Sequence, residues 1–138
     1  MKKLGLDLGD RSLGVAISDE LGFLARGLTT VFYEDNQYEK GIEYLKQLLL
    51  KEKIDTIVLG YPKNMDNSLG IQAQKSIEFK ETLERLFNIK VVLWDERLTS
   101  KLARSMMVSQ NLKKKKRKQD IDKMAATIIL QGYLDSLG

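Results

Sequence analysis

The chain has 138 residues, of which 43% are hydrophobic and 30% are charged, as is typical of one globular domain. It contains no cysteine and no histidine, which excludes disulfides, thiolate metal sites, cysteine nucleophiles and the serine-histidine-aspartate triad. Any hydrolytic chemistry must therefore depend on carboxylates, together with hard cations such as Mg²⁺ that prefer oxygen ligands. Because no apolar run is long enough for a signal peptide or a membrane span, we expect a cytoplasmic protein without a membrane partner.

The positive charge of the chain is concentrated in one segment. Lysine and arginine number 23 against 19 aspartate and glutamate, a net charge of +4. Six of the cations are consecutive: Lys113, Lys114, Lys115, Lys116, Arg117 and Lys118. Without them 17 cations face 19 anions, a net charge of −2, so the rest of the chain is mildly acidic. Such a run is typical of a mobile, solvated loop, here around residues 111–119, but it also suits binding to a phosphate backbone.

The first third of the chain predicts three strands. In residues 3–9 leucine alternates with glycine and aspartate, which is the period of a strand. Residues 13–18 alternate in the same way after the polar pair Asp10-Arg11, so we expect the two segments to form a hairpin. A third strand is expected over residues 24–32, where threonine, valine and phenylalanine gather at the end.

Beyond these strands, helical and extended patterns alternate. Apolar residues at helical spacing predict helices, and short β-branched runs predict buried strands. The expected elements are a helix over 36–51, a strand over 53–60, a helix over 71–87, a strand over 89–94, a helix over 97–110 and a last helix over 120–137. This order predicts one α/β domain over residues 1–138, with a mixed five-stranded sheet (an antiparallel hairpin, then parallel βαβ units) and helices on both faces.

Asp7 is the first candidate for chemistry. It lies in the middle of the first strand, where aspartate is disfavoured by propensity. Gly5 and Gly9 share its face and Gly14 lies on the neighbouring strand, so these positions are expected to leave space around the carboxylate. An acidic residue on a solvated strand face is the simpler alternative, but the strand-centre position favours a functional role.

Asp95 and Glu96 follow the strand over residues 89–94 at its carboxyl end, where ligands bind in open α/β sheets. They also stand at the start of the helix expected from Arg97, where the helix dipole stabilises acidic residues. The position of the two acids alone does not choose between these interpretations.

Asp122 lies in the first turn of the last expected helix, with Asp120 as its expected N-cap. This helix is apolar around most of its circumference, so it should pack against the sheet. Asp122 shares a stripe with Ala126 and Ile129, which would direct its carboxylate toward the sheet. Taken alone, the helix dipole is the better explanation of an acid at this position.

The three acidic positions together are stronger evidence for a function than any one of them alone. A strand-centre aspartate, a strand-end glutamate and an aspartate on a helix over the sheet can converge in one fold. Two-metal phosphoryl chemistry needs oxygen ligands of this kind from separate rigid elements, and it needs neither histidine nor cysteine. The acids therefore favour metal-dependent hydrolysis of phosphate esters.

Four segments, in order along nearly the whole chain, carry a resemblance to a known family. They are GLDLGDRSLGVA over residues 5–16, LGYPKNMDNS over 59–68, DERLTS over 95–100 and DIDKMAA over 120–126. Each is similar to a motif of the YqgF family, also called RuvX, of Holliday junction resolvase-like proteins. The four motifs together are far more specific than any one of them alone.

The resemblance implies an RNase H-like fold and a nuclease that matures the 5′ end of pre-16S ribosomal RNA. It implies that Asp7, Glu96 and Asp122 are the catalytic, metal-binding triad for Mg²⁺ or Mn²⁺, with Asp95 in a supporting role. All three acids of the triad are present in this chain.

The expected partner is nucleic acid, with structured RNA favoured over a DNA junction, and pre-ribosomal particles are a further expected partner. Arg97 and Lys101 are candidates to contact the substrate backbone, although a solvated helix face explains both more simply. The basic run over 113–118 is the other candidate for such contacts. The chain is expected to act as a monomer or a weak dimer.

Three other functions stay open. A Holliday junction resolvase would use the same carboxylates, but it needs two paired active sites in a symmetric dimer. A non-catalytic ribosome-assembly factor that binds nucleic acid would retain the fold without metal-dependent cleavage. Asp7-Leu8-Gly9 also resembles the first phosphate motif of actin-like nucleotide-binding domains, but 138 residues leave no room for their second domain.

Overall fold

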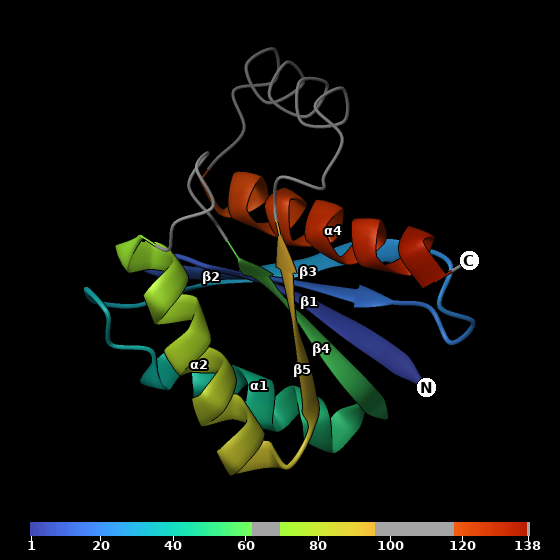
Figure 1. Ribbon diagram of the computed structural model, residues 1–138, viewed down its shortest axis with the longest axis horizontal. Coiled ribbons are helices and arrows are strands. Elements are labelled where there is room, and N and C mark those ends of the chain that lie inside the picture. Colours follow the sequence, from blue (N-terminus) through green and yellow to red (C-terminus); the bar gives the residue numbers. More distant parts are fainter. Residues whose placement is uncertain (62–69, 96–117, 138) are drawn as a thin grey trace.

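Figure 1 shows the computed structural model of the chain, which describes residues 1–61, 70–95 and 118–137, with the side chains of the last segment described from residue 122. The described elements, in chain order, are β1 (Lys2–Leu8), β2 (Ser12–Ser18), β3 (Ala25–Phe32), α1 (Glu39–Lys51), β4 (Ile54–Tyr61), α2 (Ile71–Phe87), β5 (Lys90–Asp95) and α4 (Lys118–Leu137). The expected hairpin and the alternation of helices and strands after it are both confirmed.

The five described strands form one mixed sheet in the order β3-β2-β1-β4-β5. The pairs β1–β2 and β2–β3 are antiparallel, whereas β1–β4 and β4–β5 are parallel. Adjacent parallel strands need a crossover connection, and α2 provides it between β4 and β5. The central strand β1 therefore joins the antiparallel half of the sheet to the parallel half, as the expected mixed sheet requires.

Helices cover both faces of this sheet (Figure 1), with α1 and α2 on one face and α4 on the other. Strand alternation explains why both faces are apolar. Leu4 and Leu6 of β1 are completely buried in the core that Leu45 of α1 and Leu83 of α2 complete. The opposite face carries a second core, made of Ala16, Val58, Ala126, Ile129, Leu130, Tyr133 and Leu134.

Two glycines let α4 lie close to the sheet. A Cβ atom on Gly5 would lie 2.6 Å from the Cβ of Leu130, and one on Gly14 would lie 2.2 Å from the carbonyl oxygen of Asp122. A side chain at either position would push the helix outward, because protein interiors leave no space to absorb it. We expected these bare positions to leave space around Asp7, and the structure shows instead that α4 occupies that space.

The helix expected from residue 36 begins at Glu39. Asn36 adopts a left-handed backbone with φ of 56°, and its N–H donates to the carbonyl oxygen of Asp10 at 2.7 Å. A right-handed helix cannot include a residue in this conformation, so α1 can begin only after Asn36, which the bond to the β1–β2 turn holds in place.

The last helix is described from Lys118, so Asp120 lies inside it and the expected N-cap at that residue is wrong. Lysine is a good helix former, so the helical pattern extends back over the end of the basic run, and residues 118–119 do not belong to a loop. The helix expected over 97–110 and the rest of the basic loop lie outside the described residues. Of the helices described, none combines the length and apolarity that crossing a membrane requires.

Candidate active site

Asp7 lies near the carboxyl end of β1, on the face of the sheet that α4 covers. Leu4 and Leu6 belong to the core under α1 and α2, whereas Gly5 lies against α4. Because side chains alternate along a strand, Asp7 shares the face of Gly5. It is half-buried there, at the carboxyl end of the strand, which is where open α/β sheets bind ligands.

Asp122 projects from α4 toward the sheet, as its stripe with Ala126 and Ile129 predicted. Its Oδ2 accepts a hydrogen bond of 2.7 Å from the hydroxyl of Ser12, the first residue of β2. The backbone of Asp122 also rests on Gly14, where only the absence of a side chain makes room for it. Both the backbone and the carboxylate of Asp122 are therefore held against β2.

Asp7 and Asp122 converge on one region of the sheet. Asp7 pairs with Gly14 across the hairpin, and residues opposite one another in an antiparallel pair have Cα atoms about 4.5–5.5 Å apart. Asp122 lies directly over Gly14, and therefore over the strand beside Asp7. Burial raises the pKa of the Tyr33 phenol above its usual value, and nearby carboxylates that include Asp7 and Asp122 raise it further. The two acids therefore lie over adjacent strands at the same end of the sheet.

Tyr33 holds the turn between β1 and β2 in place. Its side chain is buried, and its hydroxyl lies 2.6 Å from the carbonyl oxygen of Gly9 and 2.7 Å from that of Ser12, so it donates to this pair of acceptors. The raised pKa extends the pH range over which the phenol keeps the proton that it donates. Its ring meets Tyr38 edge-on at 5.5 Å. No local sequence pattern indicates the two carbonyl partners.

Asp95, at the end of β5, belongs to the other face of the sheet. Val92 and Trp94 pack with the core under α4, where the Trp94 ring meets Tyr133 edge-on at 5.9 Å. Alternation then directs Asp95 to the face of Leu93, which packs against the opposite core. This geometry fits a supporting role for Asp95 better than a place beside the other two carboxylates.

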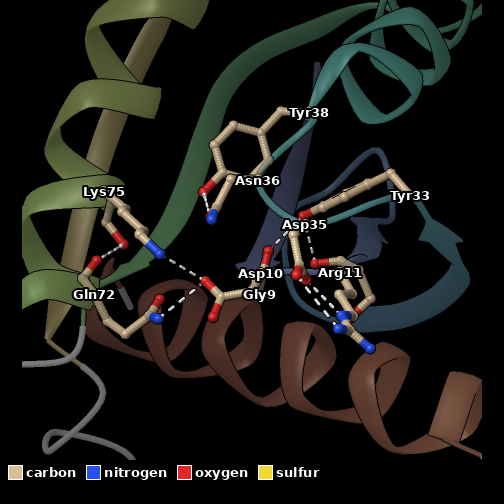
Figure 2. A network of polar contacts seen from close by, with 11 residues as sticks. Gly9, Asp10, Arg11, Tyr33, Asp35, Asn36, Tyr38, Gln72 and Lys75 are labelled. Carbon is tan, nitrogen blue, oxygen red and sulfur yellow. Dashed lines mark hydrogen bonds and ion pairs between the residues drawn. The ribbon is translucent and has the colours of Figure 1, made fainter.

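A charged network surrounds the β1–β2 turn (Figure 2). Asp10 accepts hydrogen bonds from Lys75 Nζ at 2.9 Å and from Gln72 Nε2 at 3.1 Å, both on α2. These two bonds, that of Lys75 first, lower the pKa of Asp10. Arg11, the next residue, forms an ion pair with Asp35. Sequence analysis interpreted Asp10-Arg11 only as a polar turn, because its partners lie 24 to 65 positions away in the chain.

The remaining candidates lie outside what the structure describes. They are Glu96, Arg97, Lys101, Lys113, Lys114, Lys115, Lys116, Arg117 and the side chain of Lys118. Within residues 1–61, 70–95 and 122–137, no group of three or more acidic side chains is placed to hold a metal ion. The structure thus brings together two acids of the expected triad, and the third stays a prediction.

The fold is shared with solved structures of Holliday junction resolvases. RuvC of Thermus thermophilus has a TM-score of 0.59 to this structure at 15% identity, over 99% of this chain and 96% of RuvC. The Holliday junction resolvase of fowlpox virus has a TM-score of 0.56 at 17% identity, over 99% of both chains. These likenesses confirm an RNase H-like α/β fold.

The sequence defines the family within that fold. The RuvX family, described as Holliday junction resolvase, matches residues 1–136. Relatives from Geobacillus sp. (strain WCH70) and Bacillus subtilis (strain 168) are each 48% identical, over 136 and 137 residues and 99% of both chains. A relative from Clostridium botulinum is 49% identical over 137 residues, 99% of this chain and 98% of its own. All three bear the name "Putative pre-16S rRNA nuclease". The chain belongs to the RuvX family.

Proposed function

We propose that this chain is a cytoplasmic, metal-dependent nuclease that processes the 5′ end of pre-16S ribosomal RNA. The observation that carries the proposal is the meeting of Asp7 and Asp122 at the carboxyl end of β1, one from the central strand and one from the helix above it. The names of three relatives that are nearly half identical along their whole length support RNA as the substrate.

Asp7, Glu96 and Asp122 are the proposed catalytic and metal-binding residues. Carboxylates are the ligands that Mg²⁺ and Mn²⁺ prefer, and the chain has no histidine or cysteine to favour a softer metal. Asp95 belongs to the face away from α4, which supports Glu96 as the third acid. When bound, such ions polarise phosphoryl oxygens and lower the pKa of a coordinated water.

The described elements hold their two acids rigidly. Asp7 belongs to a strand that is paired on both sides, with β2 and β4. Asp122 is held by the packing of α4 and by the bond from Ser12. Groups that are oriented before the substrate arrives reduce the entropy cost of reaching the transition state. Two neighbouring carboxylates also repel a phosphate, so cleavage should require a divalent cation to neutralise them.

The proposed substrate-binding residues are Arg97, Lys101 and the basic run over 113–118. The basic run holds the excess positive charge of the chain, since the rest has a net charge of −2. Lys75, near the site, already forms an ion pair with Asp10 at 2.9 Å, which reduces its attraction for a phosphate. The proposed partner is structured RNA in pre-ribosomal particles, bound by a monomer or a weak dimer.

Cleavage of end-labelled pre-16S RNA with Mg²⁺ or Mn²⁺ tests the proposal. Asp7→Asn and Asp122→Asn should each reduce the rate at least about 100-fold, because each removes a charged ligand while keeping the side-chain volume. Asp55→Asn is the matched control: Asp55 lies near the start of β4, at the opposite end of the sheet, and pairs on the surface with Lys3. Undiminished cleavage by both active-site variants, or equal loss in the control, would overturn the assignment.

A Holliday junction resolvase is the second candidate, because the family carries that description and RuvC, which shares the fold, has been solved with a junction substrate. The same assay on a four-way DNA junction separates the two. Cleavage of the junction alone would transfer the proposal to a resolvase. Binding of either substrate without cleavage, equal in the wild type and in Asp7→Asn, would favour the ribosome-assembly factor.

A further inference from the structure

A buried serine connects the hairpin to the proposed catalytic helix. Ser12 is 4% exposed, and its hydroxyl donates to Oδ2 of Asp122 at 2.7 Å across 110 positions of the chain. The direction of the bond is settled by chemistry, because an ionised carboxylate has no proton to donate. Hydrogen bonds to an ionised acceptor are stronger than those between neutral groups.

The backbone of Ser12 is itself held in place. Its carbonyl oxygen accepts from the N–H of Gly9 at 2.8 Å and from the hydroxyl of Tyr33 at 2.7 Å. Tyr33 is tied to the same turn through its own N–H, which donates to the carbonyl oxygen of Arg11 at 3.0 Å. The serine hydroxyl is therefore presented to α4 from a turn that is fixed at several points.

The contact also lies at the place where the two acids meet. Ser12 stands two residues before Gly14 on β2, and Gly14 pairs with Asp7 and lies under the backbone of Asp122. The serine engages Oδ2 alone, and a carboxylate has about four lone-pair positions, so the group retains capacity for a metal ion. The bond thus restricts the rotation of the Asp122 carboxylate without consuming it.

We infer that Ser12 is a positioning residue that orients the Asp122 carboxylate for metal binding. The inference rests on the proposed role of Asp122. A hydrogen-bond partner of a metal ligand fixes the orientation of that ligand, and loss of such a partner typically costs about 10–100-fold in metal affinity or activity. A serine that merely attached α4 to the sheet would affect the stability of the fold and leave metal binding unchanged.

Three variants of the full chain test this role. Ser12→Ala removes the hydroxyl, and Ser12→Thr keeps it on a residue that suits a strand. Ser18→Ala is the matched control, because Ser18 is the buried serine at the other end of β2, 2% exposed. Among the residues that the structure describes, its hydroxyl bonds to backbone atoms of Lys3 and Asp19 and to no side chain. The measurements are Mn²⁺ affinity by electron paramagnetic resonance, RNA cleavage as a function of Mg²⁺ concentration, and thermal unfolding in chelator.

For Ser12→Ala we expect an about 10-fold or greater rise in the Mn²⁺ dissociation constant and in the Mg²⁺ concentration for half-maximal cleavage. Ser12→Thr should recover most of the affinity, and Ser18→Ala should keep both values within about twofold of the wild type even if its unfolding temperature falls. Thermal unfolding in chelator identifies any variant that has failed to fold. If Ser12→Ala is such a variant, the metal affinity and metal dependence of Ser12→Thr decide.

The inference would be overturned if Ser12→Ala lowers the unfolding temperature but keeps the metal affinity and the metal dependence of the wild type. That result would leave the nuclease proposal intact, provided that Asp122→Asn still abolishes cleavage. A wild type that binds no Mn²⁺ and cleaves neither substrate would overturn both. Lower Mn²⁺ affinity in Ser12→Ala without any cleavage by the wild type would support the positioning role and contradict the nuclease.

Discussion

At the scale of the residue, the candidate site depends on polar atoms that are held by neighbours distant in the sequence. Tyr33 illustrates this dependence, because its buried hydroxyl serves carbonyl oxygens of the turn that separates Asp7 from Ser12. Burial raises the pKa of this phenol, with nearby carboxylates contributing, so it remains a hydrogen-bond donor to higher pH than an exposed tyrosine does. A side chain that takes no part in chemistry can therefore determine where the acids lie.

Tyr33→Phe should lower the free energy of unfolding by about 1–2 kcal/mol, because the carbonyl oxygens of Gly9 and of the buried Ser12 both lose a hydrogen-bond partner. Urea denaturation measures this loss. The variant should also weaken Mg²⁺-dependent cleavage less than Ser12→Ala does, because the serine hydroxyl remains opposite Asp122. Tyr44→Phe is the control, since burial also raises its pKa, and it belongs to the core away from the turn.

The same phenol predicts a change of stability with pH. The pKa of Tyr33 in the folded protein lies above the unfolded value of about 10, so between these values the folded state binds more protons than the unfolded state. The contribution of Tyr33 is thus fully present below about pH 10 and is lost as the pH rises further. The free energy of unfolding should fall more steeply from about pH 10 to 12 in the wild type than in Tyr33→Phe. Parallel curves would contradict the assignment.

At the scale of the element, α4 determines the architecture of the site. It lies across β1, β2 and β3, and its position depends on bare glycines in the strands beneath it. Its far half is fastened to the β2–β3 connection by Gln131, whose side chain accepts from the N–H of Ala25 at 2.9 Å and donates to the carbonyl oxygen of Phe23 at 2.8 Å. The helix can therefore present Asp122 to the sheet at a defined distance.

Gly14→Ala should destabilise the fold by about 1–3 kcal/mol and reduce cleavage, because the added Cβ would lie 2.2 Å from the carbonyl oxygen of Asp122. Denaturation and the cleavage assay together measure the two effects. Gly41→Ala makes the same chemical change on α1, where the Cβ would lie 3.1 Å from the movable end of Leu13. Its effect on stability should stay within about 1 kcal/mol, since alanine is favoured over glycine in a helix. Equal effects of the two substitutions would contradict the role of the close contact.

At the scale of the whole molecule, the proposed catalytic acids and the excess positive charge belong to different parts of the chain. The acids converge where the antiparallel and parallel halves of the sheet meet, at the end of β1. The excess positive charge belongs to a different part of the chain, residues 113–118, and the remainder has a net charge of −2. A phosphate backbone should therefore be attracted mainly by one segment while the carboxylates and their cations perform the hydrolysis.

This division predicts a steep dependence of RNA binding on salt. Replacing Lys114, Lys115 and Lys116 with glutamine should reduce the slope of log affinity against log salt concentration by about 2–3, if each lysine neutralises one phosphate. Filter binding over a range of salt concentrations measures the slope. The control replaces the exposed Lys40, Lys46 and Lys51 of α1, on the face of the sheet opposite α4, and it should leave the slope nearly unchanged. An unchanged slope in the first variant would exclude backbone binding by the run.

The sequence by itself determined the elements of the described chain and the hairpin at Asp10-Arg11, and it offered, without deciding, an Asp122 carboxylate directed toward the sheet. These features follow from apolar residues that recur at the period of a strand or of a helix. Both periods repeat within a few residues, so they can be recognised in a short stretch of sequence. The expected N-cap at Asp120 was wrong because helix propensity extended α4 over Lys118. Residue types alone also excluded histidine and cysteine chemistry.

Only the tertiary structure decided how the candidate site is built. The bond from Ser12 to Asp122 joins residues 110 positions apart, and the carbonyl partners of Tyr33 lie more than 20 positions away. Neither contact can be recognised in the sequence, because a serine or tyrosine that makes such a bond has the same local pattern around it as one that does not. Gly14 is a bare strand position in the sequence, and only the packing of α4 against it shows why a side chain is excluded there. Sequence patterns specify which face a side chain takes, whereas the packing of helix on sheet specifies what that side chain meets.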